Sequence, residues 1–292
     1  ALDYINIYIK KENDKEYRQI SSKELVQGRW QNKGNEHSIK LKFDPEAGYI
    51  FRPAYTDEAG NDNEDVIYGN AETPEKFIID TTKPDALIFI KDKEWMFKGF
   101  KSSLKYNRYS AKSLEIGVES YDGMSGIKNV SYCIMSDSVK DIQSMKWKEY
   151  TGTFMINQRG NQVVYARVED YAGNVRYLNT NGMIIDDVPP EINISAEDER
   201  EIYTSDVKLN VSVKENRQNN AFSGIKSVKY EVYSMGNITR QGVMYDREAQ
   251  ENSIKDVYNG EILVDSKINN SNDVIVVIYA QDNAGNETVM ER

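Results

Sequence analysis

Aspartate is the residue type whose recurrence in this chain could do chemistry, because one short acidic phrase returns three times. The phrase reads Asp-x-Ala-Gly-Asn and occupies residues 57–61, 170–174 and 282–286. Further acidic residues stand between these copies, among them Asp80, Asp122 and Asp186. Carboxylate and backbone carbonyl oxygens are the ligands that Ca²⁺ takes, usually about six to eight of them. Calcium binding is therefore the chemistry that these residues make available.

The other reactive residue types form no recognisable catalytic motif. His37 is the only histidine and Cys133 the only cysteine, so a Ser-His-Asp or Cys-His arrangement would have to use His37. The sequence has no Cys/His set for zinc and no glycine-rich phosphate loop after a strand. The many carboxylates leave a catalytic pair open, but nothing singles one out. We expect no enzyme, no catalytic residues and no cofactor-binding residues, with calcium as the one cofactor left open.

Length and charge narrow the class of protein further. The chain has 292 residues and a net charge of −10, which disfavours binding to nucleic acids or to anionic lipid. No run approaches the roughly 20 apolar residues of a membrane span, and one cysteine cannot form an intrachain disulfide. We expect an extracellular or cell-surface location, with the signal and the anchor of an exported parent outside this fragment.

The spacing of the repeated phrases predicts tandem domains. Asn61, Asn174 and Asn286 are separated by 113 and 112 residues, about the size of one small domain. Two other phrases recur in step: Ser-Gly-Ile at 125–127 and 223–225, and a proline-containing joint at 80–84 and 186–190. Proline makes such a joint short and stiff. We therefore predict domains at 1–79, 80–185 and 186–292, and a rod in which they follow one another.

Alternating apolar and polar residues predict half-buried β-strands throughout. Leu114–Glu119, Val163–Val168 and Val207–Val213 show this period of two, which is typical of antiparallel sheets. The acidic phrase lies between such strands, where glycine can adopt φ > 0 and where Asp and Asn can cap nearby backbone groups. We predict tight turns that depend on six residues: Gly60, Asn61, Gly173, Asn174, Gly285 and Asn286.

Together, the joint at 80–84, the two Ser-Gly-Ile phrases and the three acidic turns resemble the bacterial Ig-like repeats found in tandem on surface proteins and adhesins. The resemblance covers most of residues 80–292 and the later part of 1–79. It implies an all-β fold of tandem immunoglobulin-like β-sandwich domains arranged end to end, each of about 100 residues. It also implies export and a role in spacing or adhesion, and it does not imply an enzyme.

In an Ig-like sandwich, the loop before the third strand and the last hairpin lie at the same end as the N-terminus of the domain. This arrangement would gather acidic residues from separate loops: Asp80, Asp122, Glu169 and Asp170 in the second domain, and Asp186, Asp187, Glu215 and Asp282 in the third. Two interpretations stay open. Either calcium binds at the domain joints, or each Asp caps its own turn and water screens the remaining charge.

The first domain departs from the pattern, because aligning its acidic turn leaves no residues for the first two strands. We interpret residues 1–79 as a partial or atypical Ig-like domain. The aromatic residues Trp95, Tyr106 and Tyr109 could stack on a sugar ring or belong to the core and its rim. The Asn-x-Ser/Thr triplets that begin at Asn193 and Asn210 are taken as ordinary strand residues, and Cys133 as a buried structural thiol.

The function predicted from these observations is a non-enzymatic stalk, spacer or adhesion segment of an exported bacterial surface protein. The alternatives are a module whose variable loops bind a carbohydrate or a host protein, and the accessory region of a secreted hydrolase. The expected partners are neighbouring domains of the same parent chain, with a host glycan or protein left open. Nucleic acid and membrane insertion of this fragment are not expected.

Overall fold

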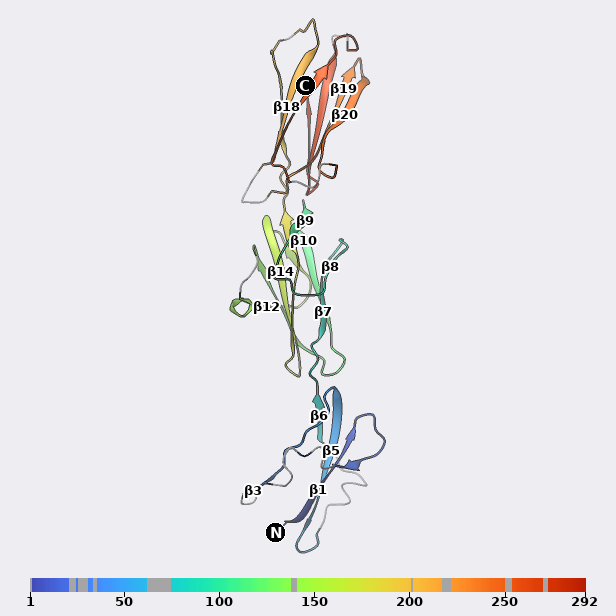
Figure 1. Cartoon of the computed structure of the whole chain (residues 1–292), viewed down its shortest axis with the longest axis vertical. Helices are drawn as coiled ribbons and strands as arrows, with labels where there is room; N and C mark the ends of the chain where they lie inside the picture. Colours follow the sequence, from blue (N-terminus) through green and yellow to red (C-terminus); the bar gives the residue numbers. More distant parts are fainter. Residues whose placement is uncertain are drawn as a thin grey trace. The chain divides into compact units, whose positions relative to one another are not determined.

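The computed structural model describes residues 2–20, 25, 31–33, 36–61, 75–137, 141–200, 202–216, 222–249, 254–269 and 273–292 (Figure 1). Within these ranges the regular structure consists of twenty-three β-strands and one turn of 3₁₀ helix, Ile142–Ser144. No helix in the described part of the chain is long and apolar enough to cross a membrane.

Four strands near the N-terminus form one antiparallel sheet. Its order is β2-β1-β5-β6, with β1 at Leu2–Lys11, β2 at Arg18–Gln19, β5 at Ala47–Asp57 and β6 at Glu75–Ile79. A short hairpin of β3 (Gln31–Lys33) and β4 (Glu36–Ser38) stands apart from it. Ile9, Tyr49 and Ala54 are buried here, and the ring of Tyr49 stacks on Phe77 with centroids 5.5 Å apart. Strand β5 ends at Asp57, the first residue of the first acidic turn.

The residues from 85 to 185 form two sheets. One has the order β13-β10-β7-β8, with β7 at Asp85–Ile90, β8 at Trp95–Phe97, β10 at Leu114–Tyr121 and β13 at Phe154–Ile156. The other has the order β12-β11-β14-β16-β9, with β15 also paired to β14. Its strands are β9 (Tyr106–Ser110), β11 (Ile127–Met135), β12 (Lys148–Glu149), β14 (Gly160–Asp170), β15 (Val175–Asn179) and β16 (Gly182–Ile185). Cys133 is a buried free thiol of β11, and burial raises its pKa.

The residues from 191 to 291 form a three-stranded and a four-stranded sheet. The first has the order β17-β18-β21, from β17 (Glu191–Ala196), β18 (Val207–Lys214) and β21 (Val257–Val264). The second has the order β20-β19-β22-β23, from β19 (Ile225–Ser234), β20 (Asn237–Asp246), β22 (Val274–Asp282) and β23 (Glu287–Glu291). One apolar core joins both sheets, for example Val211 and Ile262 from the first and Val232 and Ile278 from the second.

This packing follows from the alternation of side chains along each strand. In β17, Ile192 and Ile194 are buried while Glu191 and Asn193 are exposed, because successive residues of a strand point to opposite faces. Two sheets that bury their apolar faces against each other make a β-sandwich. The predicted all-β class and Ig-like β-sandwich architecture are confirmed.

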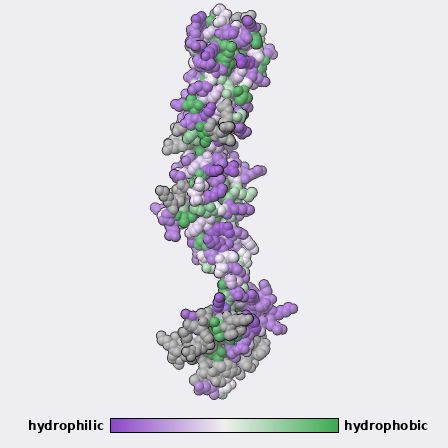
Figure 2. All heavy atoms as spheres, in the orientation of Figure 1, coloured by the Kyte–Doolittle hydropathy of each residue, from purple (hydrophilic) through white to green (hydrophobic). Residues whose placement is uncertain are grey.

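The chain separates into two compact units by its internal contacts. The first comprises Ala1–Ala86, Ser120–Val130 and Arg167–Arg176, and the second comprises Leu87–Glu119, Ser131–Ala166 and Tyr177–Arg292. The predicted division into 1–79, 80–185 and 186–292 follows the repeats and stays a prediction. We refer to residues 80–185 as the middle repeat and to residues 186–292 as the last repeat. Hydrophilic side chains cover much of the described surface in Figure 2, with hydrophobic ones scattered among them.

Candidate metal centre

The three acidic turns share one hydrogen-bonding pattern. In the second copy, the backbone N–H and the side-chain amide of Asn174 donate to the two carboxylate oxygens of Asp170, at 2.8 and 2.9 Å. The first and third copies repeat this with Asn61 on Asp57 and Asn286 on Asp282. The residue three positions after the Asp is a glycine in each turn, and its φ is +82° at Gly60, +91° at Gly173 and +98° at Gly285. These values lie in the left-handed region that glycine adopts without steric cost.

The asparagine of the turn also holds the joint that precedes each repeat. The Asn174 side-chain amide donates to the backbone carbonyl of Asp80 at 3.1 Å. In the last repeat, Asn286 donates to the carbonyl of Asp186 at 2.8 Å. The sequence predicts a role in the turn for these asparagines, and the contact with the joint was not predicted. The signal for this second contact was the recurrence of a joint and a later turn in both repeats, 94 and 100 residues apart.

The Ser-Gly-Ile phrase completes the same corner of the sandwich. The backbone N–H and the hydroxyl of Ser125 donate to Asp80 Oδ2 at 3.2 and 2.5 Å, and the N–H of Ser223 donates to Asp186 Oδ2 at 2.7 Å. The backbone carbonyl of the glycine after each serine accepts a hydrogen bond from the acidic turn. Gly126 accepts from the N–H of Tyr171 at 3.1 Å, and Gly224 accepts from the N–H of Asn283 at 3.0 Å. Joint, Ser-Gly-Ile phrase and acidic turn therefore interlock, which explains why the three phrases recur together. We call this arrangement the corner of each repeat.

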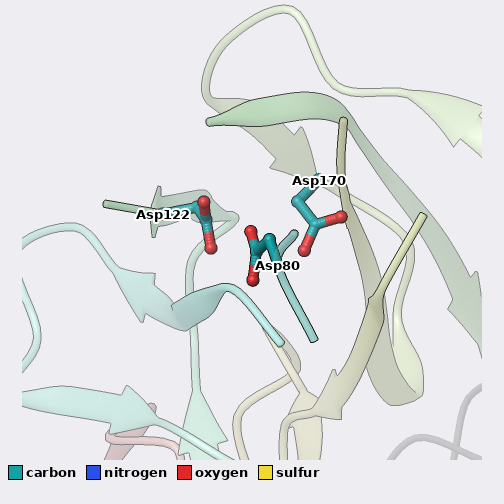
Figure 3. Close-up of side chains that lie close together, drawn as sticks. All are labelled: Asp80, Asp122 and Asp170. Atoms are coloured by element: carbon teal, nitrogen blue, oxygen red, sulfur yellow. The ribbon is translucent and has the colours of Figure 1, made fainter. Parts of the chain in front are cut away.

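The first carboxylate cluster lies in the corner of the middle repeat and consists of Asp80, Asp122 and Asp170. One carboxylate oxygen from each lies within 4.8 Å of the others, and Figure 3 shows Asp80 between the other two. Asp80 and Asp170 are buried and Asp122 is half-buried. Burial by itself raises the pKa of Asp80, but hydrogen bonds from Ser125 and Thr82 outweigh it and leave that pKa below its ordinary value.

The second carboxylate cluster lies in the corner of the last repeat and consists of Asp186, Glu215 and Asp282. Its ligand atoms also lie within 4.8 Å of one another, and the three residues are 0%, 2% and 0% exposed. Burial raises the pKa of Asp282. The hydrogen bonds from Asn286 and Gly285 oppose this rise, and the charge of Asp186 adds to it. The charged form of Asp282 is therefore disfavoured by its surroundings, whereas that of Asp80 is favoured.

One replacement and one difference in hydrogen bonding distinguish the clusters. Thr82 donates its N–H and its hydroxyl to Asp80 Oδ1, both at 3.0 Å, whereas Val188 at the matching position offers Asp186 only an N–H at 3.2 Å. The Ser125 hydroxyl bonds Asp80, whereas the buried hydroxyl of Ser223 has no hydrogen-bond partner within the described structure. Among the described residues, two hydroxyl groups donate to the joint aspartate of the first cluster, and none donates to the joint aspartate of the second.

Two of the predicted metal ligands point elsewhere. Glu169 accepts from Lys128 at 2.9 Å and from Arg167 at 2.6 Å, and Asp187 pairs with Arg159. Each lies beside a cluster residue, but neighbouring residues in extended backbone point in opposite directions. The structure therefore gathers six of the eight predicted acidic residues, three in each cluster.

The aromatic residues proposed for sugar stacking are engaged by the protein. Trp95 lies beneath Lys93 and Arg108, at 5.6 and 5.5 Å from the ring centroid. The Tyr106 hydroxyl donates to the carbonyl of Ser136, and the Tyr109 hydroxyl donates to the carbonyl of Tyr106.

Each cluster offers a cation several oxygens in one small volume. Carboxylate oxygens are among the ligands that Ca²⁺ prefers. Like charges at this separation repel without a cation or a proton. Within the described residues, none of the five cluster aspartates forms an ion pair with a lysine or arginine. In each cluster three carboxylate oxygens lie within 4.8 Å of one another, and in the described part of the chain fewer hydroxyl groups donate hydrogen bonds to the second cluster than to the first.

Comparisons with known proteins give structural similarities at low sequence identity. No family model matches the chain, and no curated protein matches it. Among solved structures, the chain is similar to fibronectin(III)-like modules of Clostridium thermocellum CbhA, with 12% identity and a TM-score of 0.31, over 70% of this chain and 90% of that one. It is also similar to a DUF3823 family protein from Bacteroides ovatus ATCC 8483, with 11% identity and a TM-score of 0.23, over 59% and 93%.

Proposed function

We propose that this chain is a non-enzymatic spacer or adhesion segment of an exported bacterial surface protein. The observation that carries the proposal is the corner described above. The phrases that the repeats share all serve to fix a joint, a loop and a hairpin to one another. Repetition of construction residues, rather than of residues in a cleft, is what a series of similar modules requires.

The spacer role can be tested by display on a bacterial surface. The chain is inserted between a cell-wall anchor and an epitope, and antibody access to the epitope is compared with that of an anchor fused directly to the epitope. We expect the inserted chain to increase access. A Gly173→Val, Gly285→Val double variant, which damages both corners, should give less access at equal expression. Equal access with and without the folded chain would contradict the proposal.

Calcium is the cofactor that supports this role. We propose that each cluster binds Ca²⁺ and that the second binds it more tightly. In the second cluster, a cation would replace the hydroxyl donors that Thr82 and Ser125 supply to the first. The backbone N–H of Ser223 donates to Asp186, and the buried hydroxyl of the same residue is a further neutral oxygen near the cluster. Binding to the folded state alone would stabilise the last repeat by about 2.7 kcal/mol at a calcium concentration a hundredfold above Kd.

A further inference from the structure

The solvent-facing side of the three-stranded sheet of the last repeat carries a regular array of small polar side chains. In one row, Asn193 of β17 pairs with Ser212 of β18, which pairs with Asn259 of β21. In the next row, Ser195 pairs with Asn210, which pairs with Glu261. We call these six residues the polar face.

The polar face borders a depression in the surface of the sheet. Its six residues, with Val211 and Gly260, line a depression of about 440 Å³. On the same face beyond the two rows, Lys208 pairs with Leu263 at one end, and Lys214 pairs with Val257 at the other. Leu263 and Val257 are 48% and 44% exposed. The amides and hydroxyls therefore lie between two pairs that each combine a lysine with an exposed aliphatic side chain.

Five of the six residues of the polar face keep their side-chain hydrogen-bonding groups free of partners among the described residues. Within the described structure, the side chains of Asn193, Ser195, Asn210, Ser212 and Asn259 make no hydrogen bonds. Glu261 differs, since its carboxylate pairs with Lys208 at 2.8 Å. Each asparagine can donate and accept side by side, and each serine can do either. Five neutral groups are therefore presented together to whatever lies on the sheet.

This chemistry selects among the classes of ligand. An apolar protein surface would bury these groups without hydrogen bonds, which costs about 1–3 kcal/mol for each group. A polyanion would find Glu191 and Glu261 beside Lys214 and Lys208, hence no net positive charge on this face, and a chain of net charge −10. A saccharide offers hydroxyl groups that both donate and accept, and a pair on adjacent carbons matches the two ends of an amide. The strands lie about 4.8 Å apart, which resembles the width of a sugar ring.

We propose that the polar face binds a neutral polysaccharide laid across β17, β18 and β21. The site goes beyond the spacer role and is independent of the carboxylate clusters. No aromatic ring lines the depression, so each site binds weakly, because its hydrogen bonds replace equally good bonds to water. Several copies on one surface would raise the overall affinity through multivalency.

The test is native electrophoresis of the full chain through gels that contain dextran, hydroxyethyl cellulose, galactomannan or xylan, with polygalacturonate as the anionic comparison. The protein is produced in a bacterial host, because Asn193 and Asn210 begin Asn-x-Ser triplets that other hosts could glycosylate. We expect at least one neutral polysaccharide to retard the chain. Asn210→Lys, at the centre of the polar face, should weaken this binding at least tenfold.

The matched control is Gln241→Lys, which adds the same charge at an exposed position of β20 in the other sheet. It should be retarded like the original chain, and the melting temperature of each variant checks that it folds. If Asn210→Lys does not fold, Asn193→Ala with Asn259→Ala replaces it, with the same tenfold expectation. The proposal is overturned if no neutral polysaccharide retards the chain, if only polygalacturonate does, or if the folded polar-face variant is retarded as strongly as the control.

Discussion

The two carboxylate clusters share the hydrogen bonds of the serine N–H and the turn asparagine but differ in the hydroxyl groups that donate to them. In both, a joint Asp accepts from the serine of Ser-Gly-Ile, and the turn Asn donates to the joint carbonyl. In the middle repeat, the hydroxyl groups of Thr82 and Ser125 bond to Asp80, and its pKa is lowered. In the last repeat the joint residue Asp186 lacks those two hydroxyl bonds. The turn residue Asp282 differs in another way, because burial raises its pKa. One joint aspartate receives two hydroxyl hydrogen bonds, whereas its counterpart in the other corner receives none from the residues that the structure describes.

The turn asparagines should show the largest effects. Asn286→Ala removes the donor to the Asp186 carbonyl and to the Asp282 carboxylate, and Asn174→Ala removes the matching pair. Hydrogen bonds to charged, buried groups contribute about 1.5–3 kcal/mol each, so either change should lower the free energy of unfolding by at least that much. Asn61→Ala is the control, because among the described residues Asn61 bonds only within an exposed turn. It should cost less than about 0.5 kcal/mol. Denaturant unfolding measures all three, and equal losses would contradict a shared corner.

The turn glycines come next. Gly173 and Gly285 have φ of +91° and +98°, and nothing lies within 4 Å of the Cβ that a substitution would add. The cost of Gly173→Val or Gly285→Val is therefore that of the backbone conformation, about 1–2 kcal/mol or more. Calorimetry should show each variant shifting the transition of its own repeat. A single transition that moves as a whole would show that the repeats do not unfold independently.

Giving the second cluster the donor that the first possesses should reverse part of the difference. Val188→Thr places a hydroxyl where Thr82 donates to Asp80. In chelator, we expect it to stabilise the last repeat by about 0.5–1.5 kcal/mol, the usual contribution of one hydrogen bond. Thr82→Val in the middle repeat is the reciprocal change and should destabilise by a similar amount. Melting curves of both variants in chelator decide this, and a destabilising Val188→Thr would count against the comparison.

A change of pH should have the smallest effect on stability among these predictions, and the sign of that effect should differ between the two clusters. The folded-state pKa of Asp282 is raised above its ordinary value of 3.8, so its contribution to stability is present below pH 3.8 and lost as pH rises through the raised pKa. The folded-state pKa of Asp80 is lowered from 3.8, so its contribution is present above pH 3.8 and lost as pH falls through the lowered pKa.

Melting curves in chelator, compared with those of Asp282→Asn and Asp80→Asn, measure the two contributions. Each variant should remove the pH dependence assigned to its own Asp. Slopes of the same sign at both residues would contradict the assignment.

Much of this structure could be predicted from the sequence, because strand alternation and spaced turns are local signals. Ig-like topology then indicated that Asp80, Asp122 and Asp170 would meet. Glu169 was included because it adjoins Asp170, although alternation in β14 already directs the two side chains to opposite faces. The polar face was missed because the Asn-x-Ser triplets become one array only when strand register sets Asn193, Ser212 and Asn259 side by side. Register depends on long-range pairing, which a single sequence does not display.

Calcium-dependent melting of the last repeat tests the central claim most directly. Calorimetry of the full chain in chelator and in about 1 mM Ca²⁺ is compared with that of Asp282→Asn, which keeps the turn but removes a carboxylate. Asp170→Asn is the matched change in the first cluster. We predict that calcium raises the melting temperature of the last repeat, that Asp282→Asn abolishes this rise, and that Asp170→Asn leaves it intact. Identical curves for the original chain in calcium and in chelator would contradict the account.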